Sequence, residues 1–150
     1  MNRNTGRRMR LVMLMILVIA VLITSTGCGG VYPPIEKKYY SNLNNYITES
    51  AIVDAITISE EYRTVSIRFT EIDEAYQMSV FMVYEENYDI VIENGIADKI
   101  TVGDVVTFTS APRIFGNGYK MPIVALSMGD DIILSFVEGY TNWMERYRFW

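Results

Sequence analysis

Residues 51–69 read AIVDAITISEEYRTVSIRF, and this stretch decides the fold class. Residues 51–58 are rich in β-branched side chains, and residues 62–69 alternate apolar and polar side chains, as a half-buried strand does. Only residues 59–61 separate the two runs, and so short a connection joins antiparallel neighbours. The stretch therefore predicts a β-hairpin.

The rest of the chain carries further short apolar runs separated by turn signals. Asn-Gly, which tolerates positive φ at both central turn positions, occurs at 94–95 and 117–118. The expected strands are residues 77–84, 88–92, 105–109, 113–115, 119–121, 123–126 and 132–136. A helix is expected at 141–150, with a single helical turn at 96–100. Many short strands with regular turns predict a mainly β protein, either an antiparallel barrel or a sandwich.

The order of these elements resembles that of a small OB-type barrel: three strands, a connection with one helical turn, then two strands. Residues 100–105 (ITVGDV) place a Gly-Asp turn before the fourth strand, where that family commonly has one. The resemblance covers about residues 50–127 and implies a closed antiparallel barrel, followed here by a short C-terminal helix. A β-sandwich is the alternative fold for the same strands.

The first 27 residues have the layout of an export signal. Four arginines, at positions 3, 7, 8 and 10, precede an unbroken apolar run over residues 11–23, and small or polar residues follow at 24–27. As a helix this run rises about 20 Å at about 1.5 Å per residue, less than the ~30 Å hydrocarbon core of a bilayer. The length favours a signal peptide over a membrane-spanning helix.

Residues 24–30 (TSTGCGG) resemble the cleavage region of bacterial lipoproteins. Gly27 and Cys28 match the last two motif positions, Thr26 is acceptable, and Ser25 stands where an aliphatic residue is typical. The resemblance implies cleavage before Cys28, diacylglycerol on its sulfur and, in many bacteria, acylation of the new N-terminus. Two or three acyl chains hold a protein firmly to a bilayer, whereas one binds reversibly.

The alternative is an uncleaved N-terminal anchor. Because the arginines hold the N-terminus inside, both readings place the rest of the chain on the outer face of the bacterial cytoplasmic membrane. The expected organisation is a signal peptide at 1–27, a lipidated cysteine and spacer at 28–48, and a β-barrel domain with a C-terminal aromatic helix at 49–150. Pro33 and Pro34 predict extended backbone in the spacer, although its tyrosines allow part of it to lie against the domain.

The composition excludes several kinds of chemistry. The chain has no His and one Cys, so it holds neither an imidazole base, a Cys/His zinc site nor an internal disulfide. Four of its 13 basic residues precede Cys28, which leaves nine against 18 acidic residues, a net charge of −9. Because nucleic-acid affinity comes largely from Lys and Arg at phosphates, we expect no nucleic-acid partner.

Carboxylates are the remaining candidates for chemistry. A glycosidase-type acidic pair is one alternative, and a Ca²⁺ site at residues 85–89 (EENYD) is another. The acidic residues lie at expected strand ends and turns, where charges are ordinarily solvated, and residues 85–89 lack the EF-hand spacing. We therefore expect no enzyme, no metal site and no cofactor.

The second Asn-Gly turn is the first candidate surface for ligand binding. Its residues are Arg113, Phe115, Asn117, Tyr119 and Lys120. Alternation places the first three on one face, with Tyr119 across the turn, and Arg and aromatic side chains are enriched at binding hot spots. In OB-like barrels the hairpin of the last two strands helps to form the ligand face. These residues predict a non-catalytic binding module for a protein or a surface glycan, and the simpler alternative is a hairpin tip stabilised by an aromatic pair.

The C-terminal segment is the second candidate surface. Asn142, followed three residues later by Glu145, predicts the start of a helix. Its shared aromatic face would comprise Tyr140, Trp143, Tyr147 and Trp150. A helix of ten residues needs a surface to pack on. That surface is the open end of the barrel, the membrane interface or a partner, and in the last case the chain is an accessory subunit of a cell-envelope complex.

Overall fold

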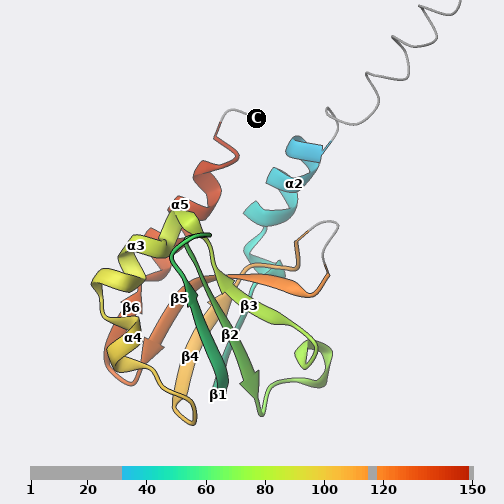
Figure 1. Ribbon diagram of the computed structural model, residues 1–150. Coiled ribbons are helices and arrows are strands. Elements are labelled where there is room, and N and C mark those ends of the chain that lie inside the picture. The colour runs from blue at the N-terminus through green and yellow to red at the C-terminus, as the bar shows by residue number, and fades with distance from the viewer. Residues whose placement is uncertain (1–31, 115–117, 149–150) are drawn as a thin grey trace, which may run out of the picture. The chain divides into compact units, whose positions relative to one another are not determined.

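The computed structural model describes residues 32–114 and 118–148, with side chains from Glu36 onward. The compact folded unit begins at Pro34. Its strands are β1 (Ile47–Ser59), β2 (Thr64–Thr70), β3 (Val80–Val83), β4 (Val105–Ser110), β5 (Lys120–Met128) and β6 (Asp131–Leu134) (Figure 1). Its helices are α2 (Tyr32–Ser41), α3 (Glu85–Glu93), α4 (Ile96–Lys99) and α5 (Phe136–Glu145), with 3-10 turns η1 (Leu43–Asn45) and η2 (Glu74–Tyr76).

Five of the six strands close into a barrel. The sheet order is β3-β2-β1-β4-β5-β6, and β3 also pairs with β5. This closing pair is parallel and sets Val80 opposite Lys120, whereas the other pairings are antiparallel. The small OB-like barrel predicted from the order of elements is confirmed. The sandwich alternative is wrong, because the pairing of β3 with β5 closes five of the strands into one layer.

The hairpin predicted from residues 51–69 is confirmed as β1 and β2, in a register that opposes Ile56 to Ile67. β1 is long enough to pair with β2 along its second half and with β4 along its first, with a bulge between Val53 and Ala55. Inside the barrel the rings of Phe69 and Phe108 stack at 4.4 Å, and Phe81 lies against both. These buried aromatic rings fill the centre of the barrel, where each contributes a large apolar area.

The connection between β3 and β4 is more helical than the sequence predicted. Residues 88–92 lie in helix α3 and not in a strand, while the helical turn expected at 96–100 is confirmed as α4. The prediction failed because Tyr88 and Val91 are buried at helical spacing, and so short an apolar run suits either element. Gly95 adopts a φ of 78° between the two helices, a left-handed conformation that favours glycine.

The C-terminal helix starts earlier than predicted. Ser135, not Asn142, caps α5: the Glu138 backbone N–H donates to the Ser135 hydroxyl at 3.3 Å, and that hydroxyl donates to the Glu138 carboxylate at 2.6 Å. Asn142 lies within the helix, where its amide donates to the side chain of Asn87 in α3 at 3.1 Å. Asn87 is buried and donates in turn to the Gly139 carbonyl at 3.0 Å, so these contacts join α3 to α5.

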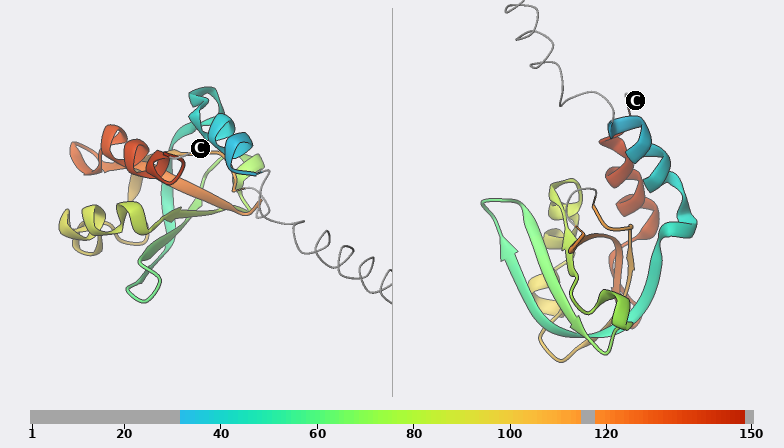
Figure 2. Two further views of the ribbon diagram at one scale, coloured as in Figure 1. Left: turned by 90° about the horizontal axis from the view of Figure 1, so that it is seen from above. Right: turned by 90° about the vertical axis from the view of Figure 1, so that its right-hand side faces the viewer.

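Helix α2 replaces the extended spacer predicted for this region. Pro33 and Pro34 lie in its first turn, where a missing N–H costs no intrahelical hydrogen bond, so the prediction of extended backbone was wrong. Figures 1 and 2 show α2 beside α5. The contact is made by Tyr40, which is 1% exposed and stacks on Tyr147 at 5.5 Å between ring centroids. From Pro34 onward α2 is therefore part of the folded unit and not of a spacer.

Candidate functional site

Three of the five predicted ligand residues lie within the described part of the chain. Arg113 follows β4, and Tyr119 and Lys120 lie where β5 begins; all three are exposed. The hairpin closes through a hydrogen bond from the Ile114 N–H to the Lys120 carbonyl at 3.0 Å. Phe115 and Asn117 lie outside the described residues. The expected strands at 119–121 and 123–126 are one continuous strand, β5, which contains Pro122.

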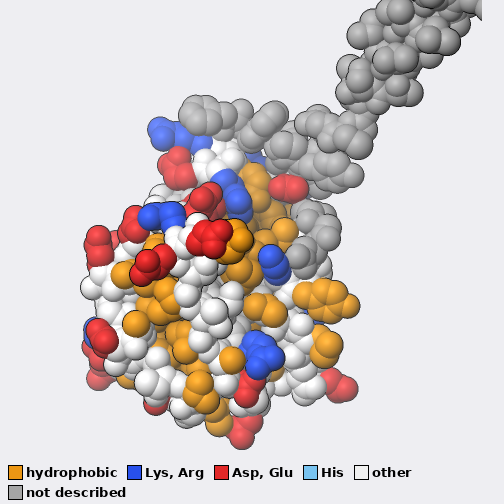
Figure 3. All heavy atoms as spheres, viewed as in Figure 1, with side chains coloured by type: hydrophobic (Ala, Val, Ile, Leu, Met, Phe, Trp, Pro, Cys, Tyr) orange, Lys and Arg blue, Asp and Glu red, His pale blue; other side chains and the backbone are white. Residues whose placement is uncertain are grey.

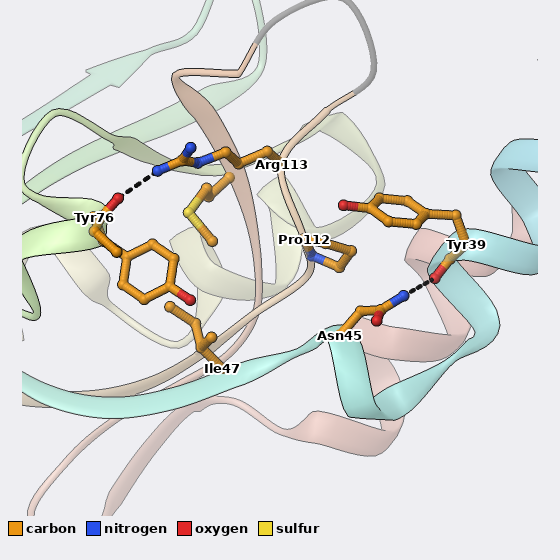
Figure 4. A pocket seen from close by; sticks show the side chains of 8 residues that line it. Tyr39, Asn45, Ile47, Tyr76, Pro112 and Arg113 are labelled. Atoms are coloured by element: carbon orange, nitrogen blue, oxygen red, sulfur yellow. Dashed lines mark hydrogen bonds between the residues drawn. The ribbon is translucent and has the colours of Figure 1, made fainter.

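A cavity of about 580 Å³ opens at the end of the barrel next to this hairpin. We call it the barrel-mouth cavity, and Figure 4 shows residues that line it: Tyr39, Asn45, Ile47, Tyr76, Pro112 and Arg113. They come from α2, η1, β1, η2 and the β4–β5 connection, which meet here because β1 and β5 start at this end of the barrel while β4 ends at it. Tyr119 and Lys120 do not line the cavity.

Two short capped turns place side chains on the cavity wall. Asn42 caps η1 by accepting a hydrogen bond from the Asn44 N–H at 3.1 Å, and this turn leads to Asn45. Asp73 caps η2 in the same way, accepting from the Ala75 N–H at 2.8 Å, and this turn presents Tyr76. Asn and Asp before such turns satisfy backbone N–H groups that would otherwise lack partners, so both walls are fixed by local sequence.

Arg113 provides the positive charge of the cavity. Its Nη2 donates to the Ala75 carbonyl, and its Cζ lies 5.9 Å from the centroid of the Tyr76 ring. One of its five N–H groups is thereby engaged, and the aromatic ring supports the guanidinium. Figure 4 shows the guanidinium turned toward the η2 turn, and within the described residues its remaining N–H groups form no further hydrogen bond.

Asn45 provides a polar group on the opposite wall. Its Nδ2 donates to the Tyr39 carbonyl at 3.0 Å, which orients the amide. Among the described residues no hydrogen bond to Asn45 Oδ1 is formed, so this oxygen can accept one from a ligand. The remaining wall is apolar, formed by Ile47, Pro112 and Met121.

No protein-family model, curated protein or solved structure matches this chain. The geometry of the cavity is therefore what indicates its use. Within residues 32–114 and 118–148, no three acidic or other metal-ligating side chains come together where they could hold a metal ion. Of the helices described, none is both long and apolar enough to cross a membrane.

The C-terminal aromatic residues, which we expected to pack on the barrel end, the membrane interface or a partner, contact helix α2. Trp143 and Tyr147 are buried, Tyr140 is partly buried, and Trp150 lies outside the described residues. Tyr40 packs edge-on against Trp143 at 5.5 Å and stacks on Tyr147, so α2 covers this surface from within the chain. With α2 packed, Trp143 and Tyr147 both have intramolecular partners, and docking of a partner through this segment stays a prediction.

Tyrosines of this aromatic cluster make the fold sensitive to alkali. Burial raises the pKa of Tyr84 to about 12 and also raises the pKa values of Tyr46 and Tyr147 above the ordinary 10. Between pH 10 and 12 the unfolded chain loses phenolic protons that the folded chain keeps, so the free energy of unfolding falls as the pH rises. We expect a lower urea midpoint at pH 11 than at pH 9, with a smaller drop in Tyr84→Phe. Tyr62→Phe, at a position 69% exposed, serves as the control, and equal midpoints at the two pH values would contradict this account.

Sequence reasoning identified Arg113 but missed Tyr39, Asn45 and Tyr76. The first two lie in the segment predicted to be a spacer, and Tyr76 lies in a predicted loop. Asn42 and Asp73 are of residue types that favour turns, but nothing in the neighbouring sequence indicates that their turns meet at one end of the barrel. That meeting depends on the pairing of β1 with β4 and of β3 with β5.

Proposed function

We propose that this chain is a lipid-anchored, extracytoplasmic binding module without catalytic activity, whose ligand occupies the barrel-mouth cavity. The observation that carries the proposal is the convergence of Arg113, Asn45 and two tyrosines on one cavity at the open end of the barrel. A cavity of this size, with apolar and aromatic side chains and a few convergent polar groups, is typical of a ligand site.

The anchor is supported by the export signal at 1–27 and by Cys28 at the cleavage position. Only Gly29, Gly30 and Val31 separate Cys28 from α2. The four residue steps from Cys28 to Tyr32 span about 14 Å at most, so a lipid on Cys28 would hold the folded unit close to the outer face of the membrane. The ligand is then a component of the cell envelope or of the adjacent medium, either a protein or a surface glycan.

Replacing Cys28 by alanine tests the anchor. We expect Cys28→Ala to lose the mass of the acyl chains and to leave the membrane fraction or accumulate unprocessed, because no other cysteine can accept the lipid. The measurements are intact-protein mass spectrometry and cell fractionation. An unchanged mass together with an unchanged location would refute lipidation.

A photoreactive side chain in the cavity tests the ligand site. In intact cells, p-benzoylphenylalanine in place of Tyr76 is expected to capture a discrete protein or glycan, which mass spectrometry identifies. The matched control carries the same group in place of Tyr62, which lies on the β1–β2 turn outside the cavity. The same products from both positions, or none from position 76, would show that the cavity is not the ligand site.

A further inference from the structure

We infer that the barrel-mouth cavity binds a carboxylated sugar, with Arg113 holding the carboxylate and Asn45 accepting from a sugar hydroxyl. This inference rests on the proposed ligand site and names the chemistry of its ligand. It is carried by the lack of an ion pair at Arg113 within the described residues, by the contacts that hold its guanidinium and by the aromatic walls of the cavity.

Arg113 differs from the other described arginines because it forms no ion pair with an acidic side chain, whereas each of the others forms one. Arg63 pairs with Asp89 at 2.6 Å, Arg68 with Asp54 at 3.3 Å, and Arg146 with Glu86 at 3.3 Å. Arg148 likewise pairs with Glu145. Every acidic side chain of the protein lies between Glu36 and Glu145, within the described residues, and none of them forms an ion pair with Arg113.

This contrast is informative because the domain is strongly acidic. Figure 3 shows acidic side chains spread over the face it draws, with fewer Lys and Arg side chains among them. Arg113 lies at a cavity and forms no ion pair with a carboxylate of the described residues. It is therefore suited to bind the carboxylate of a ligand. The excess of acidic residues would also repel polyanions, so the ligand carries one anionic group at Arg113 and not a chain of phosphates.

The guanidinium is oriented before the ligand arrives. The hydrogen bond to the Ala75 carbonyl and the Tyr76 ring hold Arg113 at the rim, and η2 is fixed in turn by the Asp73 cap. A planar guanidinium with remaining N–H donors matches a carboxylate, which it can bind through two parallel hydrogen bonds.

The rest of the cavity suits a sugar ring. Tyr39 and Tyr76 offer aromatic surface to the C–H face of a pyranose, and Asn45 Oδ1 offers an acceptor for a hydroxyl. A carboxylated hydrocarbon would leave Asn45 unpaired, and a neutral sugar would leave Arg113 unpaired, each at a cost in free energy. A hexuronate offers a carboxylate to Arg113 and a hydroxyl group to Asn45, so both side chains gain a partner.

Calorimetric titration of the full chain in detergent micelles tests the ligand class. The probes are sodium glucuronate and glucose, which differ in the carboxylate. We expect saturable binding of glucuronate, at least about tenfold tighter than that of glucose and weaker at higher salt. Arg113→Gln is expected to lose about tenfold in affinity for glucuronate, while Arg113→Lys retains part of it. Arg68→Gln removes the same charge from an arginine outside the cavity and should bind as the parent does.

Three results would overturn the inference: equal affinity for glucose and glucuronate, undiminished affinity in Arg113→Gln, or no saturable binding of either sugar. Circular dichroism of each variant checks that the fold is retained, and Arg113→Lys keeps the test valid if Arg113→Gln misfolds. These outcomes are separate from the proposed function. If the photoreactive group at position 76 crosslinks to a ligand but the protein does not bind glucuronate, the cavity is a binding site for another class of ligand.

Discussion

Replacing Gly139 by alanine is expected to destabilise the protein by about 3 kcal/mol, because α5 lies directly on β5 at this residue. A Cβ at position 139 would lie 2.8 Å from the carbonyl carbon of Val124 and closer still to its oxygen. Both atoms belong to the backbone of β5 and cannot rotate away, so the whole helix would have to move outward. The movement would also strain the hydrogen bond from Asn87 to the Gly139 carbonyl.

The measurement is equilibrium unfolding in urea, followed by circular dichroism. Gly118→Ala is the matched control, because no atom of the described residues lies within 4 Å of a Cβ built at that position. We expect its midpoint to stay close to that of the parent chain. A Gly139→Ala variant as stable as the Gly118→Ala variant would show that α5 does not pack on β5 as described.

Replacing Trp143 by alanine should cost about 3–5 kcal/mol, the range for deleting a large buried aromatic side chain. Trp143 is 1% exposed and lies at the centre of a cluster formed by Tyr40, Tyr84 and Tyr147, with ring centroids at 5.5–6.4 Å. Its loss would leave a cavity between α2 and α5 and remove the surface on which Tyr40 packs. We therefore expect α2 to detach before the barrel unfolds.

Hydrogen exchange of α2, read by mass spectrometry, measures this detachment, and urea unfolding measures the overall loss. Val137→Ala changes a residue of the same helix that is 74% exposed and should alter neither quantity. If α2 stays as protected in Trp143→Ala as in the parent, the packing of α2 on α5 does not depend on Trp143.

Strands with alternating apolar and polar side chains were predictable, because this alternation can be recognised within a few consecutive residues. Residues 51–69 formed the expected hairpin, and the order of the strands indicated the barrel. The predicted element at 88–92 was wrong because an apolar run of that length does not distinguish a strand from a buried helix. Asn142 has the spacing of a cap, but Ser135 with Glu138 begins the helix about two turns earlier.

The candidate site was only partly predictable. Arg113 stood out because a basic and aromatic turn is unusual in an acidic domain. Asn45 and Tyr76 carry no local signal of function, since both lie in polar turn-rich segments far apart in the sequence. They come together when β1 pairs with β4 and β3 pairs with β5.

The amino-acid sequence by itself determined the mainly β architecture and the strand hairpins, because both depend on patterns within a few residues. The tertiary structure decided which faces are buried and which are free. It placed α2 over Trp143 and Tyr147, and it brought Tyr39, Asn45, Tyr76 and Arg113 to one cavity. These outcomes depend on contacts between residues distant in the chain, whose free energy is realised only when the barrel has closed.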